Sequence, residues 1–394
     1  MSSEASRKAA TQRRNIFARK SIAALQHEAN SHGMKRTLSA TNLVFLGVGC
    51  ILGAGIYVMT GSAAAHYAGP AVVLSFLIAG AACGLTALCY AELASAMPVS
   101  GSAYSYSYAA IGEVAAWIVG WLLLLEYGLA AAALAVGFSG YFTSLMADFN
   151  IHIPALLATP AIDAIPAPGG TTFVETGGFN LVAVLSIAVV TVLLIIGIRE
   201  SARANNIMVV VKILVLVAFI AVGVRFVDPG NWSPFIPEKE GTFTYGWGGV
   251  LRAASILFFA YIGFETVSTA AAETKDPQRA MPIGILGSLL ICTVMYILVS
   301  MVMTGVVSYR ALGVADPIAV AVNHMNLPKF AMLIKLGALM GLASVLLVTC
   351  YGQSRVSYAM GHDGLLPPFF CRIHKTFRTP HLATLFFGVL SALM

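Results

Sequence analysis

The sequence predicts an all-α polytopic membrane protein whose first and sixth spanning helices are interrupted. Of its 394 residues, 58% are hydrophobic and only 10% are charged, whereas soluble domains carry about 25% charged residues. Apolar runs of about 20 residues, the length that crosses a bilayer, recur along the chain. Two of these runs, Leu43 to Ala65 and Leu251 to Ala272, are interrupted at similar points of the two halves of the chain.

Eight spans are predicted after a polar and basic N-terminal segment, residues 1–40. The spans are 41–66, 70–96, 112–147, 178–198, 206–228, 247–272, 282–308 and 329–360. The third is longer than a straight crossing, so we expect it to tilt or to extend beyond the bilayer. A ninth run, Leu382 to Met394, is too short to cross. We therefore expect residues 41–394 to form a transmembrane domain that is incomplete at its C-terminus.

The distribution of Lys and Arg predicts a cytoplasmic N-terminus. With that orientation, sixteen Lys and Arg residues lie on the inner side and six on the outer side, as the positive-inside rule requires. Because of where these charges lie, the net charge of +6 is not a signal for nucleic-acid binding. We expect the protein in the plasma or inner cell membrane, in contact with its lipids. Residues 12–30 form either a basic amphipathic helix on the inner leaflet or a solvated tail.

Several classes of chemistry lack their sequence signatures. The six cysteines include no CxxC pair, which favours packed, reduced thiols over a metal or redox site. No Walker-type GxxxxGKS, HExxH or GxSxG motif is present. We therefore expect no cofactor, no metal and no ATP-driven step, and an integral-membrane enzyme is the least favoured class.

The interruption of the first run is rich in glycine. Gly53 and Gly55 flank the small residue Ala54 in the segment NLVFLGVGCILGAGIYVMTG. Small residues also allow close helix packing in membranes, and that interpretation stays open. A local break instead exposes amides at the N-terminus of a half-helix, where partial positive charge suits a carboxylate.

The interruption of the sixth run is aromatic and then glycine-containing. A break there frees the carbonyls of Phe259, Ala260 and Ile262, which could accept hydrogen bonds from an ammonium group. A Gly263 kink without a ligand is the alternative. A carboxylate held by amides and an ammonium held by carbonyls together describe an α-amino acid, and matched interruptions of this kind mark transporter binding sites.

Among the charged residues inside the predicted spans, the candidates for function are Lys212, Glu126 and Glu265. Such residues are costly in a bilayer and are functional candidates. Lys212 either snorkels to the inner interface or carries a proton, doing the work of a bound sodium ion. Glu126 either attracts a cationic substrate side chain or makes a structural hydrogen bond. The candidate substrate-binding residues are Ile51, Gly53, Ala54, Gly55, Glu126, Phe259, Ala260, Ile262 and Glu265, with Lys212 for proton coupling.

Three segments resemble the amino acid–polyamine–organocation superfamily, within its cationic amino acid transporter branch. They read MKRTLSATNLVFLGVGCILGAGIYVMTG, FFAYIGFETVSTAAAETKDPQRAMPIGI and GQSRVSYAMGHDGLLPPFF. The chain departs from the family pattern at Ala54, often serine, and at His362, where the family commonly has arginine before Asp-Gly.

The resemblance implies inverted five-helix repeats with helices 1 and 6 unwound at the substrate. It implies that Gly53, Ala54 and Gly55 meet the substrate carboxylate, and that the second break meets the amine. It also implies that Lys212 stands where sodium-coupled relatives hold a cation, so that H⁺ would be the coupling ion.

The sequence thus predicts a secondary active transporter of amino acids that works by alternating access. Proton-coupled symport, with a possible preference for cationic amino acids, is the leading hypothesis. The alternatives are an amino acid exchanger and a non-transporting membrane sensor that binds an amino acid.

Overall fold

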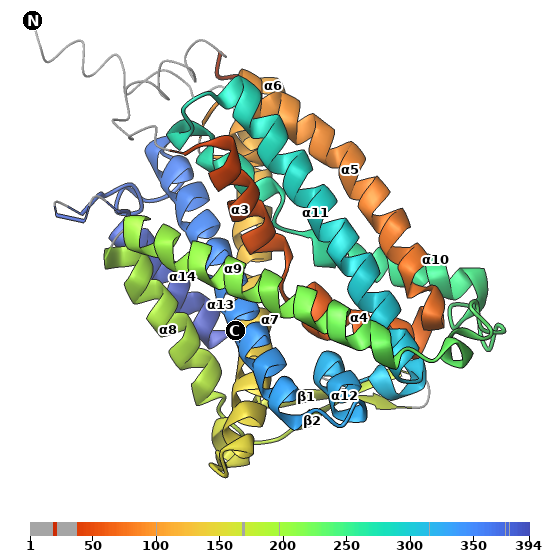
Figure 1. The fold of residues 1–394 in the computed structure, drawn as a ribbon. Coiled ribbons are helices and arrows are strands. Elements are labelled where there is room, and N and C mark those ends of the chain that lie inside the picture. Colours follow the sequence, from red (N-terminus) through yellow and green to blue (C-terminus); the bar gives the residue numbers. More distant parts are fainter. Residues whose placement is uncertain are drawn as a thin grey trace, which may run out of the picture.

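The computed structural model describes residues 19–21, 38–99, 101–167, 170–196, 198–314, 316–374, 376–377 and 379–394. These residues are almost entirely helical (Figure 1). Apart from residues 19–21, the N-terminal segment expected to form an amphipathic helix or a solvated tail lies outside the described residues. Lys375 and Arg378, two of the predicted inner-side charges, also lie outside them.

Eleven α-helices of eight or more residues occur in the described part of the chain. They are α3 (Ala40–Ile51), α5 (Val72–Ala96), α6 (Ala103–Ala110), α7 (Glu113–Asp148), α8 (Leu181–Ile196), α9 (Ile198–Gly223), α10 (Gly246–Leu257), α11 (Pro277–Val306), α12 (Pro317–His324), α13 (Pro328–His362) and α14 (His381–Leu393). The other helical pieces, which are 3-10, π or very short α segments, are η1 (Gly55–Met59), α4 (Thr60–Ala63), η2 (Ala64–Ala68), η3 (Gly69–Ala71), η4 (Ala155–Leu157), η5 (Val224–Phe226), η6 (Pro229–Trp232), η7 (Phe258–Tyr261), η8 (Glu265–Glu273) and η9 (Tyr309–Leu312).

Six helical stretches of the described chain are long and apolar enough to cross a membrane. The first of these, Ala40–Ala96, contains both the first and the second predicted spans. The helices α8 and α14, with 16 and 13 residues, are apolar but shorter. The long third helix that the sequence predicts is present as α7, with 36 residues.

One local prediction from the sequence is wrong. We expected Arg199 and Arg203 in a loop before the fifth span, but α9 already begins at Ile198. No Gly or Pro interrupts residues 198–205, so the helix continues beyond its apolar part. Between α7 and α8 the chain also forms a hairpin, in which β1 (Ile162–Ala167) pairs antiparallel with β2 (Gly170–Glu175). The run Thr-Thr-Phe-Val in β2 favours a strand.

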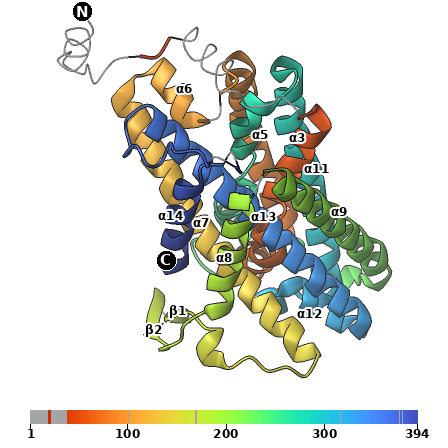
Figure 2. The ribbon, with the colours of Figure 1, turned by 90° about the vertical axis from the view of Figure 1, so that its left-hand side faces the viewer.

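The predicted interruptions of the first and sixth spans are present. The first separates α3 from η1 at residues 52–54, and the second separates η7 from η8 at residues 262–264. Both lie inside the bundle, because α3 packs against α9, α11 and α13, and η8 packs against α3, α5, α11 and α13. The helices α7 and α13 run along each other beside them (Figure 2).

The end of the bundle at which α3 begins is called the proximal end below. Leu38 N–H donates to the Glu273 carbonyl (3.1 Å) and Lys275 N–H donates to the Leu38 carbonyl (3.1 Å). These bonds tie the start of α3 to the end of η8. Lys20, from the short described N-terminal piece, pairs with Asp363 after α13 at 2.5 Å. The start of α3 and the ends of η8 and α13 therefore all lie at the proximal end.

Candidate functional site

The first break leaves three successive amides between two hydrogen-bond ladders. The Leu52 N–H donates back to the Val48 carbonyl (3.1 Å), which closes α3. The next ladder starts when Ile56 and Tyr57 N–H donate to the Gly53 carbonyl (3.1 and 3.2 Å). The amides of residues 53–55 thus occupy a helix N-terminus, where N–H groups have no partner within the helix. This is the environment that suits a carboxylate.

The second break depends on a glycine. At Ile262 the backbone leaves the helical region (φ −53°, ψ 135°), and Gly263 follows with φ +120°. Side-chain-bearing residues rarely adopt such a φ. A Cβ atom on Gly263 would also lie only 2.5 Å from Cys50 Sγ of the first broken span. Gly263 is therefore needed both for the turn and for the close approach of the two spans.

Glu265 caps the second break from within its own segment. Its side chain is buried, and its Oε2 accepts a hydrogen bond from the Gly263 N–H (2.8 Å). The Thr266 hydroxyl donates to its Oε1 (3.2 Å). The carboxylate thus satisfies a donor that the break sets free, a structural role that the sequence did not distinguish from substrate contact.

The two breaks touch each other, and Tyr296 of α11 joins them. A Cβ on Gly55 would lie 2.5 Å from the Ala260 Cβ, so only glycine permits this approach. The Tyr296 hydroxyl lies 2.7 Å from both the Ile51 and the Ala260 carbonyl oxygens, and it can donate to one at a time. The Phe259 carbonyl accepts from the Ile262 N–H (3.2 Å). Each of these carbonyls keeps a second lone pair for an ammonium group.

A cavity of about 50 Å³ lies where the breaks meet. Its lining comes from the two broken spans, α7 and α13: Cys50, Ile51, Ala54, Gly55, Tyr127, Ala130, Ala133, Leu134, Phe259, Ala260, Ile262, Gly263, Glu265, Thr266, Val345 and Thr349. At about 10–15 Å³ for each water, this volume holds a few water molecules or a small solute. We call it the central cavity.

The central cavity brings together most of the site residues that the sequence singled out, but not all of them. Gly53 belongs to the break but packs toward Val345 rather than lining the cavity. Glu126, half-buried on α7, is also outside the lining. Its carboxyl group is near enough to Glu265 for the two to interact electrostatically. Any effect of Glu126 on a ligand in the central cavity is therefore electrostatic rather than a direct contact.

Lys212 of α9 holds the end of the first half-helix. It is fully buried, and its Nζ donates to the Gly49 carbonyl (2.7 Å), the Leu52 carbonyl (2.8 Å) and the Ser344 Oγ (2.8 Å). An ammonium group has three N–H donors, and each has an acceptor here. Lys212 therefore does not snorkel to an interface.

Two residues of this arrangement were missed from the sequence, Tyr296 and Ser344. Each lies in a long, mostly apolar helix. The Tyr296 hydroxyl contacts a carbonyl at the first break, and the Ser344 hydroxyl accepts from the Lys212 ammonium group. Ser344 also donates toward the Gly341 carbonyl at 2.9 Å. A buried tyrosine usually needs a hydrogen-bond partner, so polar side chains in otherwise apolar spans were the available signal.

Comparison with known proteins shows the family. Residues 38–394 match the family model described as amino acid permease. The chain is 44% identical over 378 residues to the methylthioribose transporter of Bacillus subtilis, covering 96% of this chain and 78% of that protein. It is 45% identical over 382 residues to the branched-chain amino acid permease BcaP of the same organism, covering 96% and 79%. It is 41% identical over 345 residues to the chloroplastic cationic amino acid transporter 9 of Arabidopsis thaliana, covering 86% and 58%.

The fold has a counterpart among solved structures. A crystal structure of MhsT in complex with L-phenylalanine superposes with a TM-score of 0.63 over 92% of this chain and 79% of that one, at 16% identity. This likeness confirms the predicted architecture of inverted repeats with discontinuous first and sixth helices. The relatives are permeases and transporters, which confirms that the chain is not an enzyme. The chain is a multi-pass membrane protein that belongs to the amino acid permease family.

Proposed function

We propose that this chain is a proton-coupled secondary transporter of amino acids that works by alternating access. We also propose that it lies in the plasma or inner membrane, with its N-terminus in the cytoplasm. The observation that carries the proposal is the position of Lys212, whose ammonium group binds two carbonyls at the end of the first half-helix. A group that holds this end when charged and releases it when neutral couples a proton to the helix rearrangement.

The central cavity supports an α-amino acid as the substrate. The amides of residues 53–55 suit the α-carboxylate, and the carbonyls of Phe259, Ala260 and Ile262 suit the α-ammonium group. These backbone groups come from two spans that contact each other at Gly55 and Ala260. The recognised part of the ligand is thus the part that all amino acids share.

The other lining residues of the central cavity would surround the substrate side chain and so determine which side chains are accepted. Ala130, Ala133, Leu134 and Val345 are apolar, and they favour an aliphatic side chain. Glu126 would favour a cationic side chain, but it does not line the cavity and it interacts electrostatically with a second carboxylate, Glu265. We therefore propose aliphatic amino acids as the first substrates to test and keep the cationic preference as the competing hypothesis. The names of the relatives include both a branched-chain permease and cationic amino acid transporters.

The test is uptake into proteoliposomes that contain the purified protein. Labelled leucine, alanine, arginine and lysine are offered with and without a pH step that is acidic outside, while the membrane potential is clamped. Accumulation above equilibrium only with the pH step supports the proposal. Uptake that requires preloaded unlabelled amino acid and ignores the pH step identifies an exchanger. Saturable binding without any uptake identifies a sensor.

A further inference from the structure

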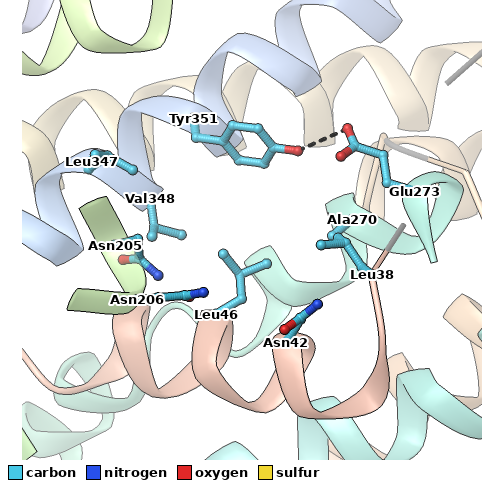
Figure 3. A pocket seen from close by; sticks show the side chains of 10 residues that line it. All are labelled: Leu38, Asn42, Leu46, Asn205, Asn206, Ala270, Glu273, Leu347, Val348 and Tyr351. Atoms are coloured by element: carbon cyan, nitrogen blue, oxygen red, sulfur yellow. Dashed lines mark hydrogen bonds between the residues drawn. The ribbon is translucent and has the colours of Figure 1, made fainter. Parts of the chain in front are cut away.

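A second cavity lies at the proximal end of the bundle. It encloses about 130 Å³ between α3, α9, η8 and α13 (Figure 3). Its lining is Leu38, Asn42, Leu46, Asn205, Asn206, Ala270, Glu273, Leu347, Val348 and Tyr351. We call it the proximal cavity. At about 10–15 Å³ for each water, this volume corresponds to roughly ten water molecules, which is enough space for an aliphatic amino acid.

The proximal cavity continues the line of the central cavity. Three elements, α3, η8 and α13, contribute lining residues to both cavities. On α3 the lining passes from Cys50 to Leu46, and on η8 it passes from Thr266 to Ala270, which is about one helical turn in each case. A ligand that leaves the central cavity along these elements toward the proximal end therefore reaches the proximal cavity next.

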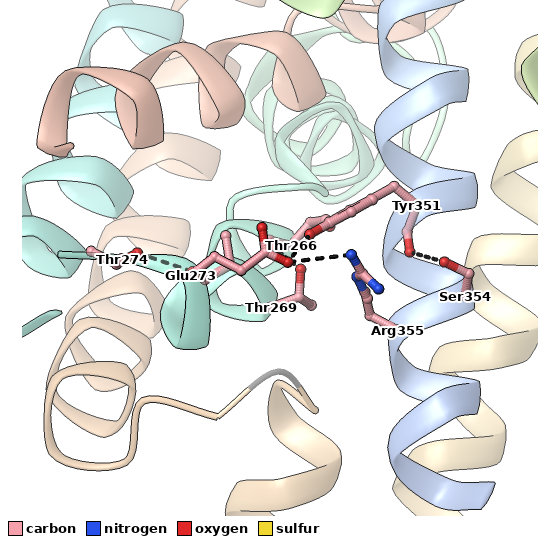
Figure 4. A network of polar contacts seen from close by, with 8 residues as sticks. Thr266, Thr269, Glu273, Thr274, Tyr351, Ser354 and Arg355 are labelled. Carbon is pink, nitrogen blue, oxygen red and sulfur yellow. Dashed lines mark hydrogen bonds and ion pairs between the residues drawn. The ribbon is translucent and has the colours of Figure 1, made fainter. Parts of the chain in front are cut away.

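One side of the proximal cavity carries a carboxylate oxygen that is open to a ligand. Glu273 Oε1 accepts a hydrogen bond from the Tyr351 hydroxyl (3.2 Å) and lies 3.2 Å from Arg355 Nη2 (Figure 4). Glu273 Oε2 accepts no hydrogen bond in the part of the chain that the structure describes. In Figure 3 this second oxygen points into the cavity. The ion pair thus fixes the carboxylate in place and leaves Oε2 as an acceptor for an ammonium group.

The other side of the proximal cavity carries two carboxamides, Asn42 of α3 and Asn206 of α9. Figure 3 shows both across the cavity from Tyr351. Neither side chain has a hydrogen-bond partner among the described residues. A carboxamide supplies two N–H donors, and these suit the oxygens of a carboxylate. The two sides of the cavity therefore offer an acceptor with negative charge and a pair of donors.

This arrangement discriminates between classes of ligand. A simple cation would pair with Glu273 and leave both carboxamides unused, whereas a simple anion would be repelled by Glu273. A zwitterion uses both sides, because its ammonium group can donate to Oε2 while its carboxylate accepts from the carboxamides. The apolar part of the lining suits an aliphatic side chain, and it consists of Leu38, Leu46, Ala270, Leu347 and Val348.

We propose that the proximal cavity is a second binding site for the transported amino acid, which occupies it between the central cavity and the aqueous phase at the proximal end. The α-ammonium group donates to Glu273 Oε2, and the α-carboxylate accepts from Asn42 and Asn206. This inference rests on the proposed function, because it takes the transported ligand to be an amino acid. Since the proximal cavity binds through side chains and the central cavity through backbone groups, substitutions can alter the proximal site alone.

The experiment changes Asn42 and measures the two faces of the membrane separately. Asn42→Leu removes the donor at similar size, Asn42→Asp places an anion that repels the α-carboxylate, and Asn42→Gln keeps a carboxamide. The matched control is Thr41→Asp, which adds the same charge at an exposed neighbouring position outside the lining. Counterflow of labelled against unlabelled amino acid at equal pH, in right-side-out and in inside-out membrane vesicles, gives the half-saturating concentration on each face.

We expect Asn42→Asp to raise the half-saturating concentration roughly tenfold or more on one face, which is the cytoplasmic face in the proposed orientation. Asn42→Leu should raise it roughly three- to tenfold, as expected for the loss of one hydrogen bond to a charged group. Asn42→Gln and Thr41→Asp should match the wild type, and the opposite face should change by less than about twofold in every variant.

The possible failures are distinguishable. If the wild type shows no counterflow of leucine, alanine, arginine or lysine, the proposed function fails and the inference fails with it. If counterflow is present but Asn42→Asp binds normally on both faces, only the inference is overturned. A rise on one face with a matching fall on the other marks a shifted conformational equilibrium, and it also overturns the inference. If Asn42→Asp does not reach the membrane, Asn206→Asp replaces it with the same expected result.

Discussion

The two breaks that surround the central cavity are stabilised in different ways. The second break is self-contained, because the Glu265 carboxylate accepts from the Gly263 N–H two residues away. The first break is held from outside, by the Lys212 ammonium group of α9 on the Gly49 and Leu52 carbonyls. A local cap moves with its own segment, whereas a bond between two helices must break when they separate. The proposed proton coupling at Lys212 therefore acts on the first break.

The contrast extends to the kinds of groups exposed. The first break offers amides and has its carbonyls occupied by Lys212 and Tyr296. The second break offers carbonyls and has an amide occupied by Glu265. Apart from the Tyr296 hydroxyl, which also lies 2.7 Å from the Ala260 carbonyl oxygen, the side-chain partners thus occupy carbonyls at the first break and an amide at the second. Together the two breaks present complementary ends for a zwitterion.

The largest effect on ligand binding is expected from a substitution that obstructs the close approach of the two breaks. Gly55→Leu would place side-chain carbon within 2.5 Å of the Ala260 Cβ, so the amides should no longer reach a carboxylate. Ligand-dependent thermal stabilisation by alanine, leucine, arginine and lysine should disappear while membrane insertion persists. The matched control is Gly140→Leu on α7, where a Cβ meets nothing within 4 Å. Ligand stabilisation that survives in Gly55→Leu would remove the first break from the site.

An intermediate effect is expected at the cap of the second break. Glu265→Ala leaves the buried Gly263 N–H without its acceptor, which costs about 1–3 kcal/mol. Glu265→Gln keeps an acceptor oxygen at the same place and should cost less than half as much. The measurement is the unfolding midpoint of the purified variants in the absence of ligand. Equal destabilisation by Ala and Gln would mean that the charge of Glu265, rather than its cap, is what the fold requires.

The smallest effect concerns the side-chain end of the ligand. Glu126→Gln removes a charge that stands behind the cavity wall, and if it acts on substrate it should weaken arginine and lysine by roughly three- to tenfold relative to leucine. Competition of unlabelled amino acids against one labelled substrate measures this ratio. An unchanged ratio would assign Glu126 a structural role and favour the aliphatic substrate class.

The sequence predicted the breaks because their causes are local. Glycine and aromatic residues interrupt an apolar run visibly, and Lys212 and Glu265 are conspicuous in a membrane span. The supporting contacts are not local. Tyr296 meets the Ile51 carbonyl, and Ser344 meets Lys212, across 245 and 132 residues of chain. Which hydroxyl faces which carbonyl depends on helix packing, and a one-residue change in helix rotation would redirect it.

The position of Glu126 relative to the cavity and the start of α9 could not be predicted from the sequence, for the same reason. The sequence places Glu126 in a span but does not say whether it lines the cavity or stands behind the wall. It also marks where α9 becomes apolar, but a helix does not end where its hydrophobicity ends. Turn residues would have signalled an end, and residues 198–205 contain neither Gly nor Pro.

The most direct test of the account removes the charge that holds the first break. Lys212→Met keeps an apolar stem of similar length and takes away the ammonium group. As a control, Lys335→Met does the same to a buried lysine of α13 that pairs with Asp148 at the end of α7. Amino acid uptake into proteoliposomes is measured with and without an inward proton gradient. The account predicts that the gradient no longer drives accumulation in Lys212→Met, while counterflow at equal pH persists and Lys335→Met behaves as the wild type. Gradient-driven accumulation by Lys212→Met would contradict it.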